Sequence, residues 1–286
     1  MSKRDNVPFA LKLVRWGFPK LEKLVPPLAH RYFIRLFFTP LRYRRPEKEN
    51  EFVDSAEKTV LTVSGKKIQV YAWGEKTDPM ILVVHGWAGR ATQFRKFIPE
   101  LTKAGYLVVG FDGPAHGLSE GKQTNILDFD EVLKALFNEV GIPNAIITHS
   151  FGGVAVLYAI TKGLPVTTLV NIASPTIGDE VINTYLRAIN GSQSTGDAFK
   201  KWMVDTYHRT FDEFSGTTLL RQLPTPIRLL LVYDNDDQEV TIAHAEAALE
   251  VYPQAVLLRT NGLGHNRVLK EPAVIERCIG FISSPS

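Results

Sequence analysis

The sequence lacks most of the features that would tie the chain to a membrane, a metal or an oxidising compartment. Its 286 residues include a single cysteine, Cys278, which excludes an internal disulfide framework and a multi-cysteine zinc site. No stretch comes near the roughly eighteen consecutive apolar residues that span a bilayer. There is no Gly-x-x-x-x-Gly-Lys phosphate loop and no histidine–carboxylate cluster with metal-ligand spacing. We therefore expect a cytoplasmic protein without cofactor or metal, whose 44% hydrophobic residues suffice for a sizeable core.

Charge is distributed unevenly along the chain. Residues 1–45 carry eleven lysines and arginines against two acids, a net charge of +9, whereas the other residues carry 22 bases and 28 acids, a net charge of −6. The basic segment interleaves charge with aromatic residues, so it could lie on an anionic membrane surface. Alternatively, its helices, which prolines keep short, pack on the rest of the protein and show solvent their charged face. The acidic body opposes nucleic-acid binding, and we expect none.

Hydrophobic periodicity after residue 46 predicts an α/β fold. Short, nearly continuous apolar runs are typical of strands that are covered on both faces of a parallel sheet. These runs alternate with helical stretches at Ala91–Lys103, Asp128–Val140 and Val154–Lys162, which indicates strand–helix–strand crossovers. We expect a mostly parallel, doubly wound sheet in one domain, residues 47–286, with strands at Lys67–Trp73, Met80–Val84, Tyr106–Phe111, Ala145–Thr148, Val166–Ala173, Ile227–Tyr233 and Ala255–Arg259.

The alternation lapses at about residues 175–224, where helices are expected at about 179–189 and 197–214. A helical excursion between two sheet strands is a candidate cap. Its apolar residues, among them Trp202 and Met203, recur at helical spacing. They either line a substrate pocket or pack the cap onto the body.

A serine lies at the most informative point of the sequence. The strand ending near Thr148 runs directly into Ser150 and then into a helix, in the pentapeptide THSFG of residues 148–152. Such a turn is sharp and needs small residues two before and two after the serine, places that Thr148 and Gly152 occupy. It exposes the hydroxyl at a helix N-terminus, where the Phe151 amide can meet a developing oxyanion.

Three further motifs follow other strands, and together with the serine they resemble the α/β-hydrolase family. They are HGWAG at residues 85–89, DNDDQEV at 234–240 and NGLGH at 261–265, and DGPAHGLS at 112–119 adds a scaffold signature. The family's elbow is Gly-x-Ser-x-Gly, from which the chain departs at Thr148. The resemblance, which covers about residues 59–283, implies a Ser150 nucleophile, a His265 base, an Asp237 acid and an oxyanion hole from the amides of Trp87 and Phe151.

The resemblance also implies a reaction. We expect a serine hydrolase that cleaves a small-molecule carboxylic ester through an acyl-enzyme, with a medium-sized hydrophobic substrate bound by Trp87, Trp202 and Met203. The same triad serves thioesters, amides and carbon–carbon bonds, so these remain alternatives. A non-catalytic, hydrolase-like binding protein is another. Oligomeric state is left open, as is peripheral membrane contact.

Overall fold

One eight-stranded sheet organises the protein, in a computed structural model that describes residues 9–284. The strands lie in the order β1-β2-β4-β3-β5-β6-β7-β8; β2 is antiparallel to both its neighbours and all other neighbouring pairs are parallel. The prediction of a mostly parallel α/β sheet is therefore confirmed. The strands are β1 (Glu57–Val63), β2 (Lys66–Trp73), β3 (Met80–Val84), β4 (Leu107–Phe111), β5 (Ala145–His149), β6 (Thr168–Ile172), β7 (Arg228–Asp234) and β8 (Val256–Thr260).

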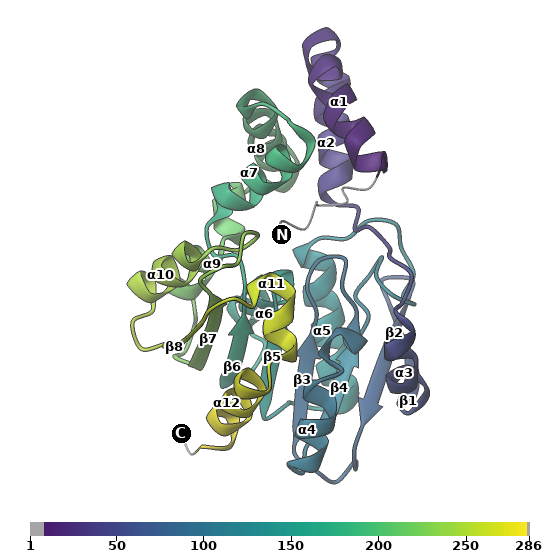
Figure 1. Ribbon diagram of the computed structural model, residues 1–286, viewed down its shortest axis with the longest axis vertical. Helices are drawn as coiled ribbons and strands as arrows, with labels where there is room; N and C mark the ends of the chain where they lie inside the picture. Colours follow the sequence, from purple (N-terminus) through teal and green to yellow (C-terminus); the bar gives the residue numbers. More distant parts are fainter. Residues whose placement is uncertain (1–8, 285–286) are drawn as a thin grey trace.

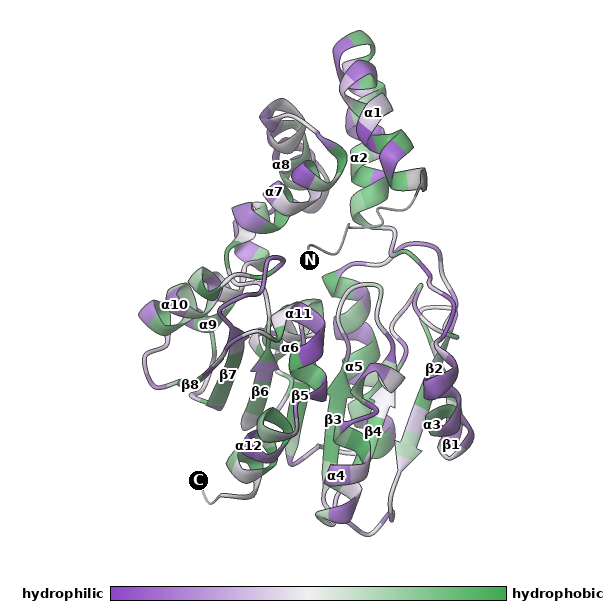
Figure 2. Ribbon diagram, in the orientation of Figure 1, coloured by the Kyte–Doolittle hydropathy of each residue, from purple (hydrophilic) through white to green (hydrophobic). Residues whose placement is uncertain are grey.

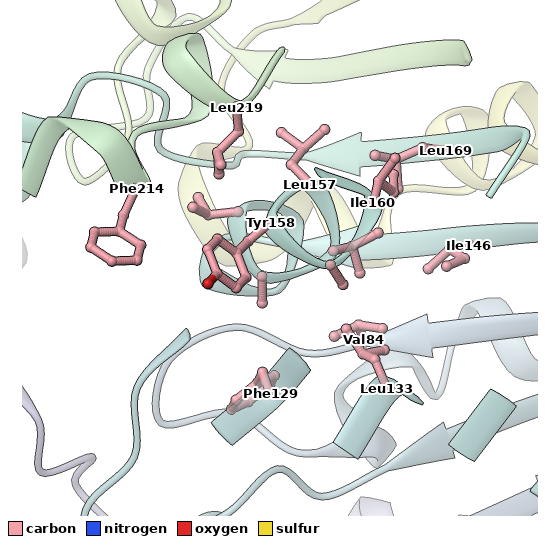
Figure 3. Packing of buried hydrophobic residues seen from close by; sticks show 14 of the residues in the cluster. Val84, Phe129, Leu133, Ile146, Leu157, Tyr158, Ile160, Leu169, Phe214 and Leu219 are labelled. Carbon is pink, nitrogen blue, oxygen red and sulfur yellow. The ribbon is translucent and has the colours of Figure 1, made fainter. Parts of the chain in front are cut away.

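Helices cover both faces of this sheet (Figure 1). In β3, Leu82 and Val84 join the hydrophobic cluster on one face, while Ile81 and Val83 join the cluster on the other. Figure 3 shows the first of these clusters, where α5 and α6 pack on the central strands. Its helices include α5 (Ile126–Val140), α6 (Phe151–Thr161) and α10 (Ile242–Val251); the opposite face carries α3 (Asn50–Asp54), α4 (Phe97–Lys103) and α12 (Pro272–Ser283).

The prediction of one continuous helix over Ala91–Lys103 is wrong. The chain forms the 3₁₀ turn η2 (Ala91–Phe94) and then starts α4 afresh at Phe97. Pro99 explains the break, because a proline ring clashes with the carbonyl four residues earlier and is tolerated only in a first turn. The helix can therefore begin no more than a few residues before Pro99.

The segment between β6 and β7 is helical and rises beyond the carboxyl ends of the strands (Figure 1). It contains α7 (Gly178–Ile189), α8 (Gln193–Tyr207), η3 (Phe211–Phe214) and α9 (Gly216–Arg221). The expected helix 197–214 is wrong at both ends. It begins four residues earlier, and His208 ends it in a left-handed conformation with φ 53°.

The basic N-terminal segment forms two helices, α1 (Phe9–Leu24) and α2 (Pro26–Phe37), which we call the hairpin, residues 9–37. Pro26 and Pro27 begin α2, where a missing N–H costs nothing. The hairpin packs on α7 and α8. Lys3 and Arg4 of the basic segment lie outside the described residues. We propose that residues 1–46 form an extension of the main domain and that residues from about 175 to 224 form its cap.

Short elements complete the chain. The segment after the hairpin is tied to the main domain by Arg42, which donates hydrogen bonds to the carbonyl oxygens of Ala115 and Ser119 at 3.0 and 2.7 Å. The remaining elements are η1 (Glu47–Glu49), α11 (Gly264–Arg267) and η4 (Val268–Lys270). In residues 9–284, none of the helices is both long enough and apolar enough to cross a bilayer.

Candidate active site

Ser150 occupies a strained turn at the centre of the sheet. Its backbone angles are φ 51° and ψ −125°, and α6 begins at the next residue. A positive φ costs free energy for any residue other than glycine and persists only where surrounding packing enforces it. Here β3 presses against the turn, since a β-carbon on Gly152 would meet the carbonyl oxygens of Val84 and His85. The turn holds the half-buried hydroxyl at the N-terminus of α6.

Thr148 stands where a glycine is expected, and β6 accommodates its side chain. The fully buried hydroxyl donates its one hydrogen to Asn171 Oδ1 at 2.9 Å, and the carbonyl oxygen of Val170 lies 3.2 Å from the same Oγ1. The branched side chain therefore points to the neighbouring strand instead of into the turn. The elbow geometry is kept despite the departure.

Asp237 and His265 form a buried pair at the carboxyl ends of β7 and β8. Asp237 Oδ2 lies 2.8 Å from His265 Nδ1, and its other oxygen accepts the backbone N–H groups of Glu239 and Val240 at 2.8 and 2.9 Å. Burial alone raises the pKa of Asp237, but the hydrogen bonds, above all that from His265, bring it below its ordinary value. A charged Asp237 therefore fixes the His265 tautomer that carries its proton on Nδ1 and leaves Nε2 free.

The neighbouring acids of this loop have other contacts. Asp234 is buried and accepts four hydrogen bonds, from the backbone N–H groups of Asp236, Leu263 and Gly264 and from the Thr260 hydroxyl. It therefore anchors the loop that carries His265. Asp236 is exposed and, among residues 9–284, accepts a hydrogen bond only from the N–H of Gly262. These contacts favour Asp237 as the partner of His265.

His265 lies beside the serine turn. Its backbone oxygen accepts a hydrogen bond from the residue before Ser150, and both Ser150 and His265 line one cavity. Within residues 9–284 no hydrogen bond joins Ser150 Oγ to His265 Nε2; the nearest carboxylate to Nε2 is that of the exposed Glu239, at 3.9 Å. Burial lowers the pKa of His265, but Asp237 and Glu239 together raise it above its ordinary value.

The HGWAG turn is held by buried histidines. His85 Nε2 accepts the N–H of Gly113 at 2.8 Å and His116 Nε2 accepts the N–H of Ala88 at 3.0 Å. Burial lowers the pKa of His85 to about 4 and, with the nearby His85 ring, that of His116 to about 3, so both are neutral acceptors. Asp112 Oδ1 adds a bond from the N–H of Ala91 at 2.9 Å. The two loops therefore stiffen each other.

The amides expected to bind an oxyanion belong to Trp87 of the HGWAG turn and to Phe151, the first residue of α6. In the described part of the chain, the backbone N–H groups of Trp87 and Phe151 donate to no protein acceptor. Their rings contact each other edge to face at 5.3 Å, and both residues line the cavity that contains Ser150. Two free donors beside a serine suit a developing negative charge.

The cavity measures about 830 Å³, within the range of ligand pockets. Trp87 and Met203 line it, together with apolar residues of α2, α7 and α8. Trp202, which was also expected to bind substrate, is not among the residues that line it. The next residue on a helix points about 100° away, and the Trp202 ring packs on Phe38 and Phe199 at 5.7 and 6.1 Å. Glu239 also borders the cavity.

Residues 79–229 match the sequence profile of the family described as "alpha/beta hydrolase fold", and this match covers more than half of the chain. The chain belongs to the α/β-hydrolase family. The serine turn, the HGWAG turn and the strands β3 to β6 lie within the matched region, and β7 begins at its edge.

Two curated proteins resemble this α/β-hydrolase in part. A monoacylglycerol lipase of Mycolicibacterium smegmatis is 30% identical over 108 residues, which is 34% of this chain and 39% of that protein. The human serine hydrolase-like protein is 35% identical over 103 residues, 33% of this chain and 48% of that protein. The aligned parts thus span less than half of the length of either relative.

Solved structures support the hydrolase fold alone. The esterase Pf2001 of Pyrococcus furiosus superposes with a TM-score of 0.63 at 19% identity, covering 85% of this chain and 95% of that one. Within residues 9–284, this α/β-hydrolase has no group of histidine, cysteine and carboxylate side chains that could hold a metal ion.

His149 is a site residue that the sequence analysis missed. Its buried ring lies between the serine turn and the histidine loop: Nε2 is 2.9 Å from the carbonyl oxygen of His265 and Nδ1 is 3.0 Å from Gln93 Nε2. Burial and the neighbouring His265 lower the pKa of His149 to about 3, so the ring is neutral. A neutral ring donates from Nε2 to His265 and accepts from Gln93 at Nδ1. The one feature of the sequence that indicates this role is the position of His149 directly before Ser150.

Proposed function

We propose that this α/β-hydrolase is a serine esterase, in which Ser150, His265 and Asp237 act as nucleophile, base and orienting acid. One observation carries the proposal: the 2.8 Å pair of Asp237 and His265 opens on the cavity that also exposes Ser150 at its strained turn. An aspartate that fixes the histidine tautomer is what a serine needs to become nucleophilic near neutral pH.

The acylation step begins with Ser150 Oγ attacking the ester carbonyl carbon. His265 Nε2 accepts the hydroxyl proton as the carbon–oxygen bond forms, and Asp237 stabilises the imidazolium. The tetrahedral intermediate then expels the alcohol, to which His265 Nε2 returns the proton. The products of this step are an acyl-Ser150 ester and a free alcohol.

Deacylation repeats the sequence with water. His265 Nε2 takes a proton from a water molecule as its oxygen attacks the acyl carbon, and it returns that proton to Ser150 Oγ when the acyl bond breaks. A carboxylic acid leaves and the enzyme is restored. The Ser150–His265 hydrogen bond must form for either step; such bonds are often long in unliganded enzymes.

The free amides of Trp87 and Phe151 are proposed to stabilise the oxyanion of both intermediates. A single donor of this kind contributes roughly 2.7–4 kcal/mol of barrier lowering. Their positions are supported by the His85 and His116 contacts, which fix the Trp87 turn, and by α6, which fixes Phe151. Because these donors are held before substrate arrives, little reorganisation is needed.

The proposed substrate is a medium-sized hydrophobic ester. The cavity beside Ser150 is lined by Trp87, by Met203 and by other apolar residues of the cap and the hairpin. An acyl chain would be buried there, and each buried methylene contributes about 0.8 kcal/mol. The partial similarity to a protein named monoacylglycerol lipase agrees with such a substrate.

Labelling with a fluorophosphonate tests the nucleophile. Ser150→Ala should abolish both labelling and hydrolysis of nitrophenyl esters. Ser174→Ala is the matched control, because Ser174 is a buried serine after the adjacent strand β6 and does not line the cavity. Labelling that survives Ser150→Ala refutes the assignment.

A substrate panel separates the remaining alternatives. Equal or faster turnover of thioesters or amides than of matched esters would reassign the leaving group while keeping the triad. Absence of both labelling and turnover would identify a hydrolase-like binding protein.

A further inference from the structure

The hairpin has one face that packs on the cap. The residues Phe18, Ala29, Phe33 and Phe37 are buried, and the last three recur every four residues along α2. Phe33 and Phe37 meet Phe199 of α8 at ring distances of 5.5 and 4.5 Å. The position of the hairpin is therefore set by this face, and its opposite face is left uncovered.

The opposite face exposes large apolar side chains. Trp16 is 65% exposed and Leu24, at the turn between the helices, is 78% exposed. A soluble surface usually scatters such residues singly, whereas six gather here within twenty positions. Figure 2 shows apolar and polar residues alternating along both helices at the end of the molecule remote from the sheet. The six are Leu13, Trp16, Leu24, Val25, Leu28 and Tyr32.

Cations surround this apolar face. The exposed Lys12, Lys20, Lys23, Arg31 and Arg35 take part in none of the ion pairs found in residues 9–284. Lys20 Nζ lies 3.2 Å from the centre of the Trp16 ring. Glu22 is the only acid in residues 9–37, and it is bound to Ser192 and Thr195 of the cap. The face is thus apolar at its centre and purely cationic at its border.

We propose that this face of the hairpin docks on the surface of an anionic lipid membrane. Helices that rest in the membrane interface combine exposed tryptophan and leucine with lysine and arginine, and the surface potential adds attraction for each cation. A second copy of the chain fits less well. A symmetric pairing of two hairpins would bring identical cations together and bury them.

Docking would also bring the cavity next to lipid. Leu36 and Phe37 of α2 line the cavity, so the element that touches the membrane is part of the substrate pocket. This consequence, hydrolysis of a lipid ester drawn from the bilayer, rests on the proposed esterase function. The membrane contact itself does not.

Vesicle flotation of the full-length chain tests the contact. The Ser150→Ala protein should float with vesicles of phosphatidylcholine mixed with phosphatidylglycerol, and much less with phosphatidylcholine alone. The triple variant Lys20→Gln, Lys23→Gln, Arg31→Gln should bind the mixed vesicles about 100-fold more weakly, at about fivefold for each cation near the surface. Trp16→Ser combined with Leu28→Ser should weaken binding to both vesicles.

A matched control removes three exposed cations elsewhere. Lys58→Gln, Lys103→Gln and Arg277→Gln lie on β1, α4 and α12, at the other end of the molecule in Figure 1, and should leave flotation unchanged. All hairpin variants should keep the melting temperature of the parent protein. When they are made in the chain that retains Ser150, they should also keep its turnover of a water-soluble ester.

Three results would overturn the inference. They are absence of flotation with the mixed vesicles, equal loss in the control triple variant, and a dimer by light scattering that Trp16→Ser abolishes. Failure of the esterase proposal looks different, because vesicle binding would persist while fluorophosphonate labelling and ester turnover were absent.

Discussion

Replacing Asp234 by asparagine is the sharpest test of how the acid loop is built. The wild-type carboxylate accepts four hydrogen bonds, two on each oxygen, at 2.7–3.1 Å. The asparagine amide keeps one accepting oxygen and turns the other into a donor. In the best rotamer the amide group faces Thr260, whose hydroxyl can rotate to accept, and Leu263, whose backbone N–H then has no acceptor.

The magnitude follows from this geometry. One buried donor without a partner costs about 1–3 kcal/mol, and the bonds that remain lose their charge assistance. We therefore expect Asp234→Asn to lower the free energy of unfolding by about 2–4 kcal/mol. That is a large share of the roughly 5–15 kcal/mol that stabilises an ordinary domain.

Urea denaturation of Asp234→Asn and Asp236→Asn measures the effect. Asp236 is exposed and holds only the N–H of Gly262, so its variant should stay within about 1 kcal/mol of the wild type. Asp234→Asn should also reduce ester turnover, because the loop that carries His265 loses its anchor. Equal losses in the two variants, or a loss below about 0.5 kcal/mol for Asp234→Asn, would refute the anchoring role.

Two further predictions concern the histidine. Glu239 helps to raise the pKa of His265, and His265 acts as a base only when it is neutral. Glu239→Gln should therefore move the acidic limb of the kcat/KM–pH profile to lower pH, with turnover retained. An acidic limb that stays in place would contradict the effect of Glu239 on His265. His149→Phe keeps a ring of similar size but loses the bond to the His265 backbone. It should lower kcat about 10- to 100-fold with little change in KM, as expected for a displaced base, whereas a pure rise in KM would argue for substrate contact.

The sheet could be predicted because its central strands are covered on both faces. Five buried residues in a row, as in β3, leave no choice between a strand and an exposed loop. The order of Ser150, Asp237 and His265 along the chain likewise predicted that they lie at one edge of the sheet, since each follows a strand of one parallel sheet: Ser150 and His265 line one cavity and Asp237 pairs with His265. Parallel strands bring their carboxyl ends to the same edge.

Pairings between distant segments could not be predicted in this way. The apolar stripe of α8 indicated a buried face, but not that Phe33 and Phe37 of the hairpin would cover Phe199. Trp202 was therefore assigned to the pocket and in fact packs beside Phe38. His149 was overlooked for the same reason, since its partners Gln93 and His265 lie 56 and 116 residues away.

Thr148 gives a test of whether the departure from the family elbow is a defect or a fitted feature. Its fully buried hydroxyl donates a hydrogen bond to Asn171 Oδ1. Thr148→Val keeps the shape and removes that donor, so unfolding free energy should fall by about 1–3 kcal/mol. Thr148→Gly, which restores the family residue, should cost about 3 kcal/mol more than the valine variant, because it also removes the three buried side-chain carbons, at about 0.8 kcal/mol each, and loosens the unfolded chain.

Chemical denaturation of Thr148→Val and Thr148→Gly, with turnover of a soluble ester measured beside it, decides the point. If Thr148 is fitted to β6, stability should fall in the order wild type, valine, glycine, and turnover should not rise in either variant. A glycine variant that is as stable as the wild type and faster would mean that the threonine strains the elbow, and that the bond to Asn171 merely compensates for that strain.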